Sequence, residues 1–207
     1  MSAEKSNSKN IGIILLAAGE SSRLGTPKQL LLLEGRTLLQ HALEYANGSN
    51  AHPVVVILGA GSDTIKQGID VSTEHVIVNA EWQEGIASSI RSGINALVEI
   101  SPVVEGAILL FCDQPYVTST LLNKLMETYK ETGKPVVACS YDNTFGPPVF
   151  FHKTIFPELL QLKGDIGARG VIRQHVDDVE LILFPKGNID IDTEADYQNL
   201  SEVTRER

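Results

Sequence analysis

The stretch IGIILLAAGESSRLGTPK, residues 11–28, decides the fold predicted for this chain. Its first part, residues 11–17, is a continuous apolar run, which is typical of a strand buried on both faces of a parallel sheet. The strand leads into a small glycine-containing turn, where unpaired backbone N–H groups suit an anion. Arg23 and Lys28 add positive charge to this turn. The stretch therefore predicts a phosphate-binding loop at the edge of an α/β sheet.

Two familiar phosphate-binding motifs do not match this loop. A Walker A loop has four residues between its first glycine and a Gly-Lys-Ser/Thr triplet. Here five residues separate Gly19 from Gly25, and Thr-Pro intervenes before Lys28. The dinucleotide-binding pattern Gly-x-Gly-x-x-Gly is also missing from the loop. We therefore expect a different kind of nucleotide-binding turn.

The composition is that of one globular domain. The 207 residues suffice for an α/β domain with a sizeable core, and the hydrophobic content of 43% is ordinary. A formal charge of −9 argues against a nucleic-acid partner, and no apolar run approaches the roughly 20 residues that span a bilayer. Residues 1–10 lack the apolar centre of a signal peptide. We predict a flexible tail over residues 1–10, one domain over residues 11–202 and a cytoplasmic location.

The two cysteines lie in apolar runs. Cys112 and Cys139 are therefore expected to be buried thiols of a reducing compartment, rather than a disulfide or a catalytic thiol. The chain has no CxxC pair, which argues against a metal site built on cysteine.

Strand and helix patterns alternate along the chain. The expected strands are residues 11–17, 53–58, 75–78, 106–112, 135–140, 149–152 and 181–184. The expected helices are residues 37–46, 63–68, 87–97, 119–132, 165–175 and 193–202, with Thr118 or Ser119 capping the fourth and Thr193 the last. This alternation predicts a single-domain, Rossmann-like three-layer α/β fold with a mainly parallel central sheet. Ligands of such sheets bind beyond the carboxyl ends of the strands.

Carboxylates beside predicted strand ends are the candidate metal ligands. Asp113 follows an apolar strand and precedes Pro115, so its carboxylate is expected to be held rigidly in the cleft, although a turn or cap aspartate is the alternative. Asp190 and Asp192 alternate, which puts both on one face of an extended segment. One or two carboxylates with substrate phosphates make an ordinary Mg²⁺ site. We predict Asp113 and Asp190 as ligands, with Asp192 as the alternative and Mn²⁺ as a possible second metal.

Amide and hydroxyl groups gather before one predicted helix. Asn79, Gly85 and Ser88 lie between a short strand and that helix, where they suit a nucleobase and ribose or simply cap the helix. The turn GAGSDT, residues 59–64, has Thr64 where a dinucleotide-binding pattern needs its third glycine. A tight turn is the better interpretation of that segment.

Two glycine-bearing turns in the second half suit a second substrate. Gly146 lies in one of them, and Arg169 follows the other. Arg169 suits a phosphate or a carboxylate, and an ordinary solvated arginine is the alternative.

These segments together resemble a known family. The pattern Leu-Ala-Ala-Gly-x-Ser-x-Arg-x-Gly-x-x-Lys at residues 16–28 is similar to the signature turn of nucleotidyltransferases with the glycosyltransferase-A-like fold, the fold of nucleotide-diphospho-sugar transferases. Further matches at residues 79–89, 113–115, 164–169 and 190–193 resemble the molybdenum cofactor cytidylyltransferases among the MobA-like NTP transferases. One departure is Gly-Pro-Pro at residues 146–148, where relatives often have Gly-His-Pro. That region is expected to face the second substrate.

The resemblance implies Mg²⁺-dependent transfer of CMP from CTP to the terminal phosphate of molybdopterin, with a recipient molybdoenzyme as a further partner. By the same resemblance, Lys28, Arg23 and Asp113 would be catalytic, and Gly146 and Arg169 would bind the acceptor. The nucleotide would be bound by Leu16, Ala17, Ala18, Gly19, Ser22, Arg23, Lys28, Asn79, Gly85 and Ser88. GMP-transferring relatives have a glycine at the position of Ala18, so its methyl group favours cytosine over the larger guanine.

Other functions stay open at this point. Within the enzyme class they are GMP transfer to molybdopterin and cytidylyl transfer to another phosphorylated acceptor, such as a sugar phosphate or an isoprenoid precursor. Outside it are a non-catalytic chaperone that carries the cofactor, and an oxidoreductase that uses the turn at residues 59–64. The joint presence of Arg23, Lys28, Asp113 and Asp190 favours catalysis.

Overall fold

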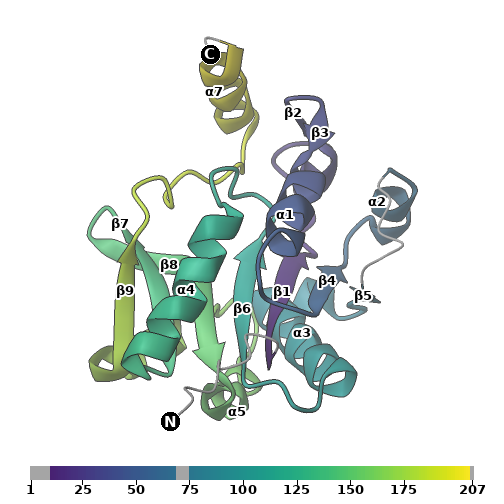
Figure 1. Ribbon diagram of the computed structural model, residues 1–207. Helices are drawn as coiled ribbons and strands as arrows, with labels where there is room; N and C mark the ends of the chain where they lie inside the picture. Colours follow the sequence, from purple (N-terminus) through teal and green to yellow (C-terminus); the bar gives the residue numbers. More distant parts are fainter. Residues whose placement is uncertain (1–9, 69–74, 206–207) are drawn as a thin grey trace.

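A seven-stranded sheet lies at the centre of the computed structural model, which describes residues 10–68 and 75–205 (Figure 1). In spatial order the strands are β5 (His75–Val78), β4 (Val54–Leu58), β1 (Ile11–Ala17), β6 (Gly106–Phe111), β8 (Thr144–His152), β7 (Val136–Tyr141) and β9 (Val179–Leu183). Of these seven, β8 alone runs antiparallel to its neighbours. The predicted α/β fold with a mainly parallel sheet is confirmed.

Helices cover both faces of the sheet, which makes three layers (Figure 1). One face is covered by α1 (Leu38–Asn47) and α4 (Ser119–Thr132), and the other by α3 (Ile86–Ile100), α5 (Phe156–Leu159) and α6 (Arg169–Gln174). A short α2 (Ser62–Gly68) follows β4, and α7 (Glu194–Arg205) lies beyond the carboxyl edge of the sheet. Among the described residues, no helix is long and apolar enough to cross a membrane.

The central strand β1 is buried along its whole length. Ile13 and Leu15 pack on one face of the sheet, while Ile14 and Leu16 pack on the other, as expected for a strand between two helical layers. Its last residues pair with the ends of β4 and β6, with Leu16 opposite both Ile57 and Phe111. The loops that follow these three strands therefore meet at one edge of the sheet.

Some element boundaries differ from those expected. The strand expected from residue 149 begins at Thr144, because residues 144–146 pair with β7 across a tight hairpin. The helix expected over residues 165–175 is shortened to α6, because Gly164 takes a φ of 61° and residues 164–168 form turns. The structure also contains a small hairpin of β2 (Leu32–Leu33) and β3 (Arg36–Thr37). This hairpin was not predicted, because strands of two residues are too short to produce a pattern in the sequence.

Hydrogen bonds show which of the expected residues cap the helices. Thr118 caps α4 by accepting from the Leu121 N–H, whereas Ser119 donates to the Tyr45 carbonyl. Thr193 accepts from the Asp196 N–H at 3.2 Å, as expected for an N-cap. Of the predicted N-terminal tail, residues 1–9 lie outside the described residues.

Candidate active site

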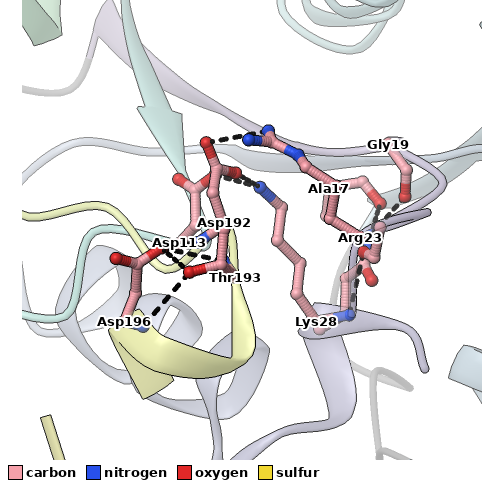
Figure 2. Close-up of polar contacts among 10 residues, drawn as sticks. Ala17, Gly19, Arg23, Lys28, Asp113, Asp192, Thr193 and Asp196 are labelled. Atoms are coloured by element: carbon pink, nitrogen blue, oxygen red, sulfur yellow. Dashed lines mark hydrogen bonds and ion pairs between the residues drawn. The ribbon is translucent and has the colours of Figure 1, made fainter. Parts of the chain in front are cut away.

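The loop after β1 is held by two side chains of its own sequence. Gln29 is fully buried, and its Nε2 donates to the Ala17 carbonyl at 2.7 Å and the Gly19 carbonyl at 3.1 Å. Ser21, at a φ of 58°, accepts from the Lys28 N–H through its Oγ at 2.9 Å. These bonds close the loop on itself, so that the Lys28 side chain turns back towards the ends of the strands (Figure 2).

Two cations and two carboxylates meet at this edge of the sheet (Figure 2). Lys28 Nζ contacts the carboxylate of Asp113 and lies 2.9 Å from Oδ1 of Asp192. Arg23 Nη2 lies 3.3 Å from the second oxygen of Asp192. The side chains of Lys28 and Asp113 are about 15% exposed, whereas that of Arg23 is 67% exposed. Residues from three separate segments therefore form one network with a buried and an open side.

The network shifts the pKa values of its members in opposite directions. Burial lowers the pKa of Lys28, but the charge of Asp113 and its hydrogen bond more than compensate, and the pKa is raised overall. Burial raises the pKa of Asp192, but hydrogen bonds and charge from Lys28, and then from Arg23, lower it overall. Both groups are therefore charged at neutral pH.

Asp190 is a third carboxylate near those of Asp113 and Asp192. Burial, followed by the negative charges of Asp113 and Asp192, raises its pKa to about 6. Asp196 fixes the neighbouring turn by accepting from the N–H groups of Asp192 and Thr193. Within residues 10–68 and 75–205, no group of three or more His, Cys, Asp or Glu side chains is placed to hold a metal ion by itself. The donor set fits a cation that also takes ligands from phosphates.

Ala18 and its two predecessors lie beneath the loop rather than in it. The side chains of Leu16, Ala17 and Ala18 are buried, while Gly19 and Ser22 are exposed. The Ala18 carbonyl accepts from the Ala60 N–H at 3.1 Å, and a Cβ atom on Gly59 would lie 2.9 Å from that of Ala18. The turn at residues 59–61 therefore packs against the loop and supports it, as the tight-turn interpretation expects.

The polar residues before α3 are paired with one another. Asn79 Nδ2 donates to the hydroxyls of Ser88 and Ser89 at 2.8 and 3.1 Å, and its Oδ1 accepts from the Glu81 N–H. Ser88 donates to the Gly85 carbonyl at 2.8 Å. Gly85 itself has a φ of 119° and lies against Gly164, where a side chain would collide. Asn79, Gly85 and Ser88 are brought together, and the two side chains brace the turn.

A pocket of about 280 Å³ opens between α3, α6 and the strands β6 and β8. Gly146 and Arg169, the two residues expected at the acceptor, both line it, and so does Phe111, two residues before Asp113. Most of the remaining wall is apolar, from residues such as Ile86 and Ile90 of α3. The pocket suits the less polar part of a second substrate.

The family follows from comparison with known proteins. The model of the MobA-like NTP transferase domain matches residues 13–179. The chain belongs to this family. The predicted membership is confirmed, and the protein is a nucleotidyltransferase.

The relatives of this MobA-like protein carry diverse names. Nicotine blue oxidoreductase of Paenarthrobacter nicotinovorans is 29% identical over 178 residues, covering 82% of this chain and 84% of the relative. Purine catabolism protein PucB of Bacillus subtilis (strain 168) is 29% identical over 196 residues, covering 89% and 92%. A structure of Rv0371c from Mycobacterium tuberculosis H37Rv in complex with manganese superposes with a TM-score of 0.77 at 27% identity, covering 94% of this chain and 99% of the other.

Two residues of the MobA-like site were not predicted from the sequence. Gln29 follows Lys28 and begins an apolar stretch, and a glutamine there gives no sign that it is fully buried. Gln114 is 6% exposed and donates to the carbonyls of Pro147 and Gly187, which ties the end of β6 to β8 and to the turn at Gly187. The signal for Gln114 was its place in the match to the family at residues 113–115, but no role was predicted for it.

Proposed function

We propose that the protein transfers CMP from CTP to the terminal phosphate of molybdopterin and releases pyrophosphate, with Mg²⁺ or Mn²⁺ as cofactor. The observation that carries the proposal is the position of Lys28. It lies between Asp113 and Asp192 at the carboxyl edge of the sheet, directly after the loop that Gln29 and Ser21 close. A cation between carboxylates, beside a turn suited to anions, is the arrangement that a metal-bound triphosphate needs.

The nucleotide is proposed to bind along the loop. Backbone N–H groups of residues 18–22, with Arg23, hold the β- and γ-phosphates, while Lys28 stabilises the charge that grows at the α-phosphate. Arg23 is exposed and has a single carboxylate contact of 3.3 Å, so exchanging Asp192 for a phosphate costs little. The turn at Gly85, which Asn79 and Ser88 brace, contacts the base and ribose.

Asp113 and Asp190 are the proposed metal ligands, with Asp192 as the alternative. Burial and then the charges of Asp113 and Asp192 raise the pKa of Asp190 to about 6, which supports this set, because a divalent cation offsets both the desolvation of a carboxylate and the repulsion among carboxylates. The manganese complex of Rv0371c supports a divalent metal in a related protein. When bound, the metal supplies neutralisation of the phosphate charge.

The chemistry needs few groups from the protein. A phosphate oxygen of the acceptor attacks the α-phosphorus of CTP, a new phosphorus–oxygen bond forms, and the bond to the bridging oxygen of the β-phosphate breaks. Pyrophosphate leaves with the electron pair of that bond. The acceptor phosphate is already a nucleophile, so no general base is required. Positioning and charge stabilisation therefore account for most of the rate.

One relative is named an oxidoreductase, so an experiment should first distinguish nucleotidyl transfer from oxidoreduction. In this chain, Thr64 replaces the third glycine of a dinucleotide pattern, and the Ala60 N–H is already bonded to the Ala18 carbonyl. Both observations favour phosphate transfer over nicotinamide binding at that turn.

Pyrophosphate release from CTP with Mg²⁺, measured with and without molybdopterin, tests the proposal. We expect release only when both substrates are present, and a weaker response with GTP. Titration with NAD(P)H, followed by nicotinamide fluorescence, is run in parallel. Nicotinamide binding without any nucleotide-dependent pyrophosphate release would reject the proposal. Binding of molybdopterin without turnover would instead indicate a cofactor chaperone.

A further inference from the structure

Tyr141 occupies a space that two glycines create. It ends β7 and is 7% exposed. A Cβ atom on Gly187 would collide with its ring, and one on Gly146 would collide with its hydroxyl oxygen. Neither glycine has a positive φ, so backbone conformation does not require glycine at these positions. We conclude that the glycines make room for Tyr141.

The hydroxyl of Tyr141 lies beside the acceptor pocket. A Cβ atom added to Gly146 would collide with Tyr141 Oη and would lie 3.3 Å from Arg169 Nη2. The hydroxyl and the guanidinium therefore both lie against Gly146. Burial and then Asp190 raise the pKa of Tyr141, while the charge of Arg169 and a hydrogen bond from it oppose them. Of the described residues that line the pocket, Arg169 is the one cation and Asp165 the one carboxylate, among walls that are mostly apolar.

Asp190, a proposed metal ligand, is also close enough to Tyr141 for its charge to raise the pKa of the tyrosine. Gln114 bonds to the carbonyls of Pro147, in the pocket wall, and of Gly187, beside the Tyr141 ring.

We propose that Tyr141 is a positioning residue that holds the Arg169 guanidinium in the pocket, where Arg169 binds the phosphate of the acceptor. This rests on the proposed function, because it assumes a phosphorylated acceptor. The tyrosine hydroxyl fixes one edge of the guanidinium, and the remaining donors match the oxygens of a phosphate. We expect Tyr141 to affect the acceptor more than CTP, because among the described residues no hydrogen bond or ion pair of residues 18–28 involves Tyr141 or Arg169.

The test is a comparison of Tyr141→Phe with Tyr129→Phe. The second variant removes the hydroxyl of a partly buried tyrosine that stacks on His152, away from the pocket. Equilibrium dialysis of molybdopterin and steady-state kinetics are measured on the full chain. We expect Tyr141→Phe to raise the Kd and KM for molybdopterin about tenfold, the effect of losing one hydrogen bond to a charged group, with the KM for CTP changed less than about twofold. Tyr129→Phe should change none of these values.

A double-mutant cycle with Arg169→Gln separates positioning from general packing. If Tyr141 acts through Arg169, Tyr141→Phe has no further effect on molybdopterin binding in the Arg169→Gln protein. Independent, additive effects would overturn the inference, as would an unchanged Kd in Tyr141→Phe. If Tyr141→Phe does not fold, Gly187→Ala provides a second test, because its Cβ would displace the Tyr141 ring and Gly187 does not line the pocket.

The outcomes also distinguish this inference from the proposed function. Wild-type protein that binds molybdopterin but does not release pyrophosphate rejects the transferase proposal and leaves the Tyr141–Arg169 test valid on binding alone. Wild-type protein that turns over CTP with molybdopterin, together with an unaffected Tyr141→Phe variant, rejects the inference alone. Wild-type protein that does not bind molybdopterin rejects both.

Discussion

Lys28 and Asp113 lie 85 residues apart in the chain, yet their side chains form an ion pair at the carboxyl edge of the sheet. The reason is the register of the two central strands. Leu16 of β1 is opposite Phe111 of β6, so the segments that follow these strands leave the sheet at the same height. The fold thus brings a cation and a carboxylate together before any substrate binds.

Replacing Lys28 tests its role at the transferred phosphate. We expect Lys28→Ala to lower kcat by about 100-fold or more, the loss typical of removing a transition-state charge contact. Lys124→Ala, which removes an exposed lysine of α4 with a 4.0 Å ion pair, is the matched control and should keep full activity. A Lys28→Ala enzyme with near-normal turnover would show that Lys28 only stabilises the fold.

The three aspartates differ in what they are expected to do. Asp113→Asn should lower kcat by about 100-fold. Asp190→Asn should raise the Mg²⁺ concentration for half-maximal activity by at least about tenfold, because loss of a direct ligand should cost no less than loss of an outer-shell partner. Asp192→Asn should leave the metal requirement unchanged and weaken CTP binding, because Asp192 pairs with Lys28 and Arg23. The reverse pattern would make Asp192 the ligand, and normal turnover in Asp113→Asn would reject the metal assignment.

Base selection is expected to depend on Ala18. We propose that the methyl group of Ala18, which lies beneath the loop, narrows the space for a purine, so in Ala18→Gly the ratio of kcat/KM for CTP to that for GTP should fall about tenfold, at the lower end of the effect of one methylene group. Ala60→Gly, in the turn that packs on Ala18, is the control for backbone loosening. An unchanged ratio in Ala18→Gly would remove the argument for cytosine.

The two thiols are expected to be inert in the folded protein. Burial raises the pKa of both Cys112 and Cys139 to about 12, and both are free and buried as predicted. Because the thiolate is the reactive form, a raised pKa keeps both groups protonated and unreactive at neutral and mildly alkaline pH. Titration with a disulfide reagent at pH 8 should label neither thiol in native protein and both after denaturation. Rapid labelling of the native protein would contradict the burial.

The sequence predicted best those parts of the fold that local patterns determine. The run at residues 11–17 is apolar on both faces because β1 lies between two helical layers, so its burial was predictable. The first half of β8 was not, because Phe-Gly-Pro-Pro reads as a turn and its strand conformation comes from pairing with β7. Strand order and the antiparallel direction of β8 depend on contacts between distant segments, which periodicity does not record.

The candidate site was likewise predictable only in part. Arg23, Lys28, Asp113, Asp190 and Asp192 were identified from residue type and position at strand ends, and the structure brings them together. The partners within the network could not be predicted, because an ion pair between distant segments requires the register of the sheet. Tyr141 also gave no signal, since its importance arises from glycines that are adjacent to it only in the folded chain.

The most direct measurement is pyrophosphate release by purified wild-type protein with CTP, Mg²⁺ and molybdopterin. Our account predicts pyrophosphate release that requires all three components and is lost in Lys28→Ala. Release should be at least about tenfold faster with CTP than with GTP, from the effect of one methyl group. Absence of release with any nucleoside triphosphate, from protein that is folded and binds molybdopterin, would contradict the central claim that this site transfers a nucleotide to a phosphorylated acceptor.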